Sequence, residues 1–224
     1  TNGLTSFSAN SSNKLWLVTA NAAIQYYDYG TGATTTGTMF ISSMTPRGVA
    51  ATDEALYVFG GESSSSGGPM ALCYRYLAST NTVSSLPSLP AARARAAVAI
   101  QANGAILVLG GLTTATANAA SASNSITRYN PTANTHETLA AVLPFRCWGA
   151  KTSRRADGTI LILAAAGNAT DDGVTLAITN RAALFNPTTG TCIALDSGGG
   201  YGTMGLLADN RTVVMGTPTL AKAI

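Results

Sequence analysis

Few residues in this chain could carry chemistry. A Ser–His–Asp set needs a histidine, and the 224 residues contain one, His136. Its segment, NTHE at residues 134–137, fits an outer β-strand, where we expect no buried serine to meet it. The adjacent Asp171 and Asp172 could touch a cation, but two neighbouring carboxylates do not make a calcium-binding loop. We interpret them as part of a solvated loop, and the sequence predicts no catalytic set, metal site or cofactor.

The three cysteines, Cys73, Cys147 and Cys192, are odd in number and lack Cys-x-x-Cys spacing. This excludes a disulfide-framework miniprotein and a cysteine-rich zinc site. One disulfide plus a free thiol, and three unpaired buried thiols, both stay open. The glycine-rich stretch SGGGYG at residues 197–202 opens no helix, so it does not predict a phosphate-binding loop.

Sequons for N-glycosylation begin at Asn10, Asn168 and Asn210. All three fall in predicted turns, where a glycan is sterically tolerated. Short loops rich in asparagine also produce sequons by chance. We interpret the three as candidate glycosylation sites, and Asn168 is the first choice because its loop is the longest.

The elements that would position these residues recur along the chain. Gly60 and Gly110, which end two of the apolar runs, lie 50 residues apart. A turn signal such as Asn-Gly or Asp-Gly precedes each run, and a polar loop with two further short strands follows the first four. Each unit therefore contains four short strands. The runs are LWLVT (15–19), LYVFGG (56–61), ILVLGG (106–111), ILILAA (160–165) and VVMG (213–216).

Four strands per unit at a period near 50 are typical of β-propeller blades. Three recurring features resemble the kelch family across nearly the whole chain: Gly-Gly after an apolar strand, the turn YNPTANT at 129–135, and Leu-Pro linkers ending in arginine at 86–93 and 143–146. The resemblance implies an all-β, kelch-type propeller. The first, fourth and fifth units lack the double glycine, and His136 and Cys192 replace an expected aromatic residue. A β-sandwich or β-solenoid with coincidental spacing is the alternative fold.

The unit count predicts one propeller segment over residues 1–224. Four complete blades are expected at residues 1–45, 46–89, 90–142 and 143–198, with part of a fifth at 199–224. Inner strands are expected near residues 47–51, 95–99 and 148–152, or at the Gly-Gly strands that pair with these segments. Kelch propellers usually close with six or seven blades, which implies a fragment of a larger propeller. Because unpaired strand edges promote association, other subunits or the rest of the same polypeptide should cover them.

The resemblance also implies one enzymatic alternative, a truncated copper radical oxidase. Oxidases of the galactose oxidase and glyoxal oxidase type are built on kelch propellers. They cross-link a cysteine, in a segment like Phe-Cys-x-Gly, to a tyrosine that opens a later blade. Cys147, within FRCWG at 145–149, and Tyr201 stand in loosely similar positions. Those enzymes also need a second tyrosine and two histidines, so we interpret Cys147 and Tyr201 as packing residues.

The composition of the chain argues against several classes of function. Only 10% of the residues are charged, and the net charge is +3. No apolar run approaches the roughly 18 residues of a membrane span, and the scattered basic residues do not form the stripe that nucleic acid requires. Hydroxyl and amide side chains dominate the surface instead, as is common in secreted, cell-surface and virion proteins. We expect no nucleic acid and no membrane span.

The sequence therefore predicts a non-catalytic binding or structural module of an extracellular, cell-surface or virion assembly. Its contacts with proteins or glycans are expected from the polar loops that follow the apolar runs. These loops cover residues 62–69, 112–125 and 168–174.

Overall fold

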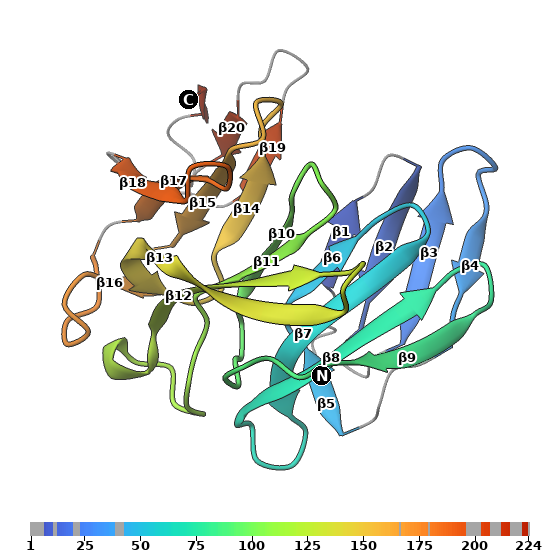
Figure 1. The fold of residues 1–224 in the computed structure, drawn as a ribbon, viewed down its shortest axis with the longest axis horizontal. Helices are drawn as coiled ribbons and strands as arrows, with labels where there is room; N and C mark the ends of the chain where they lie inside the picture. The colour runs from blue at the N-terminus through green and yellow to red at the C-terminus, as the bar shows by residue number, and fades with distance from the viewer. Residues whose placement is uncertain are drawn as a thin grey trace.

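The computed structural model describes residues 7–10, 13–19, 23–38, 43–165, 167–178, 180–195, 203–206, 212–215 and 221–223. These residues form antiparallel sheets that follow one another in chain order from the N-terminus to the C-terminus (Figure 1). The one helical element among them is a single 3₁₀ turn, η1 (Ala119–Ser121). The all-β prediction is therefore confirmed. None of the described helical segments has the length and apolar character that a membrane crossing requires.

Five sheets account for the strands. The first contains β1 (Phe7–Asn10), β2 (Lys14–Val18), β3 (Ile24–Asp28) and β4 (Thr34–Thr36). The second contains β5 (Met44–Pro46), β6 (Val49–Ala51), β7 (Ala55–Ser63), β8 (Pro69–Leu77) and β9 (Thr82–Leu86). The third contains β10 (Ala97–Ile100), β11 (Ile106–Leu109), β12 (Ser123–Asn130), β13 (Thr135–Cys147) and β16 (Ala169–Thr170). The fourth contains β14 (Lys151–Arg154), β15 (Ile160–Ala164), β17 (Arg181–Asn186) and β18 (Thr191–Leu195), and the fifth β19 (Thr203–Leu206), β20 (Thr212–Met215) and β21 (Ala221–Ala223).

The sheets are the blades of a β-propeller. The first strand of each blade contacts the first strand of the next, in the order β1, β6, β10, β14 and β19, so these strands line a common axis. Strands β6, β10 and β14 overlap the inner strands expected from the sequence. Two strands cross the expected unit divisions. Strand β5 straddles residue 45, and β13 continues past residue 142 because Arg146 and Cys147 pair with β16.

The core lies between the blades rather than within them. Successive residues of a strand point to opposite faces of its sheet, and in a blade both faces are covered. In β7, Leu56 and Val58 pack towards the first blade, whereas Tyr57 and Phe59 pack towards the third. The next apolar strand, β11, divides its side chains between the second and fourth blades in the same way. Burial on both faces explains why these runs show no hydrophobic alternation.

The double glycines stand at equivalent points of successive blades, as expected. Gly60 and Gly110 have φ angles of 63° and 62°, in the left-handed region that side chains other than glycine seldom adopt. A Cβ atom on Gly60 would lie 2.3 Å from the carbonyl oxygen of Arg93, and one on Gly110 would lie 2.7 Å from that of Cys147. Gly60 therefore lets the chain at β7 pass close to the linker that leads into the third blade, and Gly110 lets the chain after β11 pass close to the end of β13.

The outer hairpins repeat as well. Tyr76, Tyr129 and Phe185 occupy corresponding positions in the third strand of successive blades, and their cross-strand partners are Val83, His136 and Cys192. His136 and Cys192 thus occupy equivalent positions in the outer strands, as the repeat alignment predicted.

Candidate functional site

Antiparallel strands give the propeller two faces with different connections. We call one the loop face: it carries the loops between the second and third strands of each blade and the linkers that lead into the next blade. We call the other the turn face, because it carries the tight hairpins. In the second, third and fourth blades, described segments of the loop face are 46–48, 64–68, 87–96, 110–122, 148–150 and 167–178. Those of the turn face are 52–54, 78–81, 101–105, 131–134, 155–159 and 187–190, and the first blade adds the hairpin at 29–33.

A cluster of three charged side chains, Arg47, Glu62 and Arg95, lies on the loop face. Glu62 lies near the end of β7, and its side chain is only 13% exposed. Its Oε2 accepts a 2.9 Å hydrogen bond from Nε of Arg47, and its Oε1 accepts a 2.6 Å bond from Nε of Arg95. Both arginines stand two residues before an inner strand, β6 or β10. The Arg47–Glu62–Arg95 cluster therefore joins the second and third blades where their inner strands begin.

Arg95 has two features that a purely structural ion pair does not require. Its φ angle is 54°, a conformation uncommon for a side chain other than glycine. Its side chain is 41% exposed, and among the described residues none bonds its two terminal nitrogens. The carbonyl oxygen of Arg95 accepts a 2.7 Å bond from the amide of Gly149, which opens the fourth blade with φ 61°. Arg95 is thus fixed by three blades and presents its guanidinium outward.

Reasoning from the sequence missed this cluster because its members are 15 and 33 residues apart. A usable signal exists in the repeat itself. Arginine recurs two residues before the inner strands of two consecutive blades, and glutamate directly follows the first double glycine. Aligning the repeats position by position would have placed the three charges on one face.

The two adjacent aspartates belong to a tightly bonded loop. Asp171 forms an ion pair with Arg181, at 2.5 Å between Oδ2 and Nη2. Asp172 Oδ1 accepts hydrogen bonds from the amides of Thr175 and Val174 and from the hydroxyl of Thr170, and these bonds lower the pKa of its carboxyl group to about 2. Both carboxylates thus serve the loop itself. The described residues contain no group of three His, Cys, Asp or Glu side chains able to hold a metal ion.

His136 lies in β13, the outer strand predicted for it, and packs between blades. Its Nε2 lies 2.9 Å from the carbonyl oxygen of Pro87 at the end of the second blade. Its ring lies edge-on to Phe59, with ring centroids 5.9 Å apart, and contacts Tyr129. Partial burial lowers the pKa of its imidazole. These contacts assign His136 a packing role between the second and third blades.

The cysteines are all unpaired. Cys147 is fully buried, Cys73 nearly so and Cys192 partly. Burial raises the pKa of the Cys147 thiol to about 12 and those of Cys73 and Cys192 to about 11. Cys147 lies in the core between the third and fourth blades. Tyr201, its proposed counterpart in the oxidase alternative, lies outside the described residues.

The three sequon asparagines differ in their positions. Asn168 lies in a bend of the loop face and is partly exposed. Asn10 is the last residue of β1 and pairs in register with Leu15, so the strand extends over a residue expected in a turn. Asn210 lies outside the described residues. The threonine of the Asn168 sequon, Thr170, is fully buried in β16.

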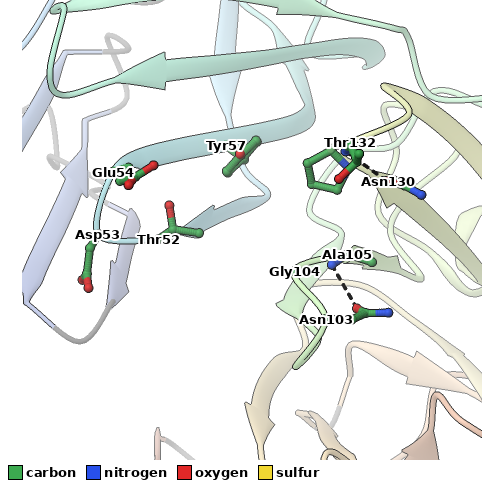
Figure 2. Close-up of a pocket in the computed structure, with 10 residues that line it drawn as sticks. Thr52, Asp53, Glu54, Tyr57, Asn103, Gly104, Ala105, Asn130 and Thr132 are labelled. Carbon is green, nitrogen blue, oxygen red and sulfur yellow. Dashed lines mark hydrogen bonds between the residues drawn. The ribbon is translucent and has the colours of Figure 1, made fainter.

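A separate cavity of about 560 Å³ opens on the turn face, between the second and third blades. Thr52, Glu54 and Tyr57 approach it from the second blade, and Asn103–Ala105 and Asn130–Thr132 line the opposite side (Figure 2). The carboxylate of Asp53 turns away from these side chains and bonds the amide of Asn13 in the first blade at 2.7 Å.

Comparisons with known proteins agree with the fold. No protein-family model matches the chain, and no curated protein sequence matches it. Among solved structures, one described as "Structure of YjhT" superposes with a TM-score of 0.72 over 94% of this chain and 71% of that one. The two sequences are 16% identical, so the likeness shows a shared β-propeller fold.

Proposed function

We propose that this protein is a non-catalytic binding module of an extracellular or surface-associated assembly, and that it contacts protein or glycan ligands through the loop face. The observation that supports this most strongly is Arg95. Its guanidinium is held in place by Glu62 and by a left-handed backbone, yet its side chain is 41% exposed and no described residue bonds its terminal nitrogens. Backbone strain of this kind concentrates where a side chain must be presented to a ligand.

The charge balance of the cluster favours an acidic group as its ligand. One carboxylate, Glu62, is shared between the guanidiniums of Arg47 and Arg95, so the cluster carries a net positive charge. A guanidinium presents paired N–H groups whose spacing matches the two oxygens of a carboxylate. Because Glu62 already holds the side chain, less conformational entropy is lost when Arg95 binds such a group.

The loop of residues 167–178 supplies an apolar contact on the same face. Val174 is 83% exposed and Ile178 is 94% exposed, although the hydrogen bonds of Asp172 fix the backbone beneath Val174. Ala177, between the two exposed positions, is anchored by its amide to the carbonyl oxygen of Ala169 at 2.7 Å. An ordered loop that exposes large apolar side chains is suited to contact with another protein surface.

The kelch-type identity of the repeat, the extracellular location and the covering of the outermost blades by other protein belong to the same proposal. They are supported by the kelch-like motifs, by the low charged fraction of 10% and by the sequons. The second and third blades bury both of their faces against their neighbours, and this supports partners that cover the outer faces of the first and last blades.

The proposal is tested with immobilised arrays of peptides and glycans in which each acidic ligand has a neutral counterpart. We expect the wild-type protein to retain acidic members, and Arg95→Gln to lower their affinity at least about tenfold, the change that 1.4 kcal/mol produces. Arg128→Gln is the matched control, because Arg128 is similarly exposed and pairs with Glu137 in the outer hairpin of the third blade.

Two results would contradict the proposal. One is an array on which no acidic ligand is retained above its neutral counterpart. The other is equal loss of binding in the Arg95 and Arg128 variants, which would mean that general positive charge attracts the ligands and that the loop face has no special role.

A further inference from the structure

The cavity on the turn face has walls of two kinds. Tyr57, Ala105 and Pro131 supply apolar surface. The Tyr57 ring lies nearly parallel to that of Phe59, at an interplanar angle of 7°, and also lies near Tyr129. Tyr57 is only 8% exposed, so the cavity borders on a ring embedded in the core between two blades.

Polar groups at the cavity are held in place by the hairpin turns. The Oδ1 of Asn103 accepts a 3.1 Å hydrogen bond from the amide of Ala105. The Oδ1 of Asn130 accepts hydrogen bonds from the amides of Thr132 and Ala133. These bonds use the oxygen of each side-chain amide, and within the described residues neither Nδ2 has a partner. Two side-chain NH2 groups, with four N–H donors between them, and the hydroxyl of Thr132 therefore stay available.

Glu54 supplies the acceptor. Its side chain is exposed, and its backbone carbonyl oxygen is fixed by a 3.0 Å bond from the amide of Ala78. Figure 2 shows its carboxylate on the same side of the cavity as Tyr57. The other carboxylate at this rim, Asp53, is instead bonded to the first blade.

We infer that this cavity binds a neutral saccharide ring. A sugar combines an apolar C–H face, which fits against Tyr57 and Pro131, with hydroxyl groups that both donate and accept hydrogen bonds. Glu54 is the matching acceptor, and the amides of Asn103 and Asn130 are the matching donors. An anionic ligand would meet the Glu54 carboxylate at the rim, and a purely apolar ligand would leave these polar groups without partners. The volume of about 560 Å³ lies within the range of small-molecule sites.

The inference is independent of the proposed function, because it concerns the opposite face of the propeller. The test is a titration of the ¹⁵N-labelled protein with glucose, galactose, mannose, N-acetylglucosamine and their β-linked disaccharides, followed by NMR. We expect at least one of these sugars to shift the amide signals of Gly104, Ala105 and Thr132 in a saturable way. Glu54→Ala and Thr132→Ala should each weaken that binding at least threefold, whereas Glu137→Ala and Arg95→Gln should leave it unchanged.

Glu54 and Thr132 are both exposed, so we expect Glu54→Ala and Thr132→Ala to fold. The NMR spectrum of each variant before titration checks that it is folded. Absence of saturable shifts with every sugar would overturn the inference. So would shifts that persist unchanged in both variants, or binding of methylammonium in preference to all sugars. A loss of array binding by Arg95→Gln with intact sugar titration would separate the two sites.

Discussion

Glu62 and Arg95 connect two consecutive blades through a 2.6 Å hydrogen bond between a carboxylate oxygen and a guanidinium nitrogen. The same carboxylate also binds Arg47, in the linker of its own blade. Ordinary surface ion pairs contribute little to stability, but Glu62 is 13% exposed and is shared by two arginines. The bond therefore both orients Arg95 and ties the second blade to the third.

Replacing this carboxylate should weaken the junction between the two blades. We expect Glu62→Gln to lower the free energy of unfolding by about 1.5–3 kcal/mol, the contribution of a hydrogen bond to a charged group. Urea unfolding measures the change. Glu137→Gln is the control, because Glu137 is 60% exposed in its ion pair with Arg128 and should cost less than about 0.5 kcal/mol. Equal stability of the two variants would mean that Glu62 has no structural role.

The left-handed glycines should tolerate substitution poorly. We expect Gly60→Val and Gly110→Val each to destabilise the protein by at least about 2 kcal/mol, since each adds backbone strain and a clash with a carbonyl oxygen. Gly67→Val is the matched control: its φ is 68°, but nothing lies within 4 Å of its Cβ position. Thermal unfolding of the three variants separates strain from crowding. Similar melting of all three would refute the close approach of the chain at Gly60 and Gly110.

Much of the fold could be predicted because each blade repeats the same pattern of buried strands and turns. Apolar strands buried on both faces, Gly-Gly at the close approach and asparagine at the outer turn recur in order. This order predicted the four-stranded unit and the equivalence of His136 and Cys192, and it reduced the inner strands to two alternatives, of which the structure shows β6, β10 and β14. Strand β16 could not be predicted. It is two residues long and lies in a loop of the fourth blade, but it pairs with β13 of the third.

His136 should make stability depend on pH. Its pKa is lowered in the folded protein, chiefly by burial, so the unfolded chain binds the proton more readily. Stability should therefore fall as the pH drops through the ordinary histidine pKa, near 6.5, towards the lower folded value. In His136→Val, which copies Val83 of the preceding blade, this part of the pH dependence should be absent. Unfolding curves of both proteins between pH 7.5 and about 5.5 test the difference, and parallel pH profiles would contradict it.

The thiols should differ in reactivity according to burial. We expect Cys73 and Cys147 to resist a thiol reagent in the native protein, because both are buried and have raised pKa values. Cys192, which is partly exposed, should react slowly. All three should react once the protein is unfolded without a reductant. Recovery of a single thiol in that sample would reveal a disulfide and contradict the arrangement of the cysteines.

The candidate site was harder to predict than the fold, since its chemistry comes from residues that only the fold brings together. Arg95 adopts the left-handed conformation that Gly149 adopts in the next blade. An arginine in the sequence, unlike a glycine, does not indicate a positive φ angle. The cavity on the turn face likewise combines three hairpins, at 52–54, 101–105 and 130–134, which looked like ordinary turns in the sequence.

The most direct test of the binding proposal is a thermodynamic cycle on Arg95. The strongest acidic ligand of the array and its carboxamide counterpart are titrated into the wild-type protein and into Arg95→Gln by calorimetry. If Arg95 engages the acidic group, the losses of binding free energy caused by Arg95→Gln and by the carboxamide ligand should not add up. The coupling between the two changes should reach about tenfold in affinity, or 1.4 kcal/mol. Additive losses, with coupling near zero, would show that the acidic group binds elsewhere and would contradict the account.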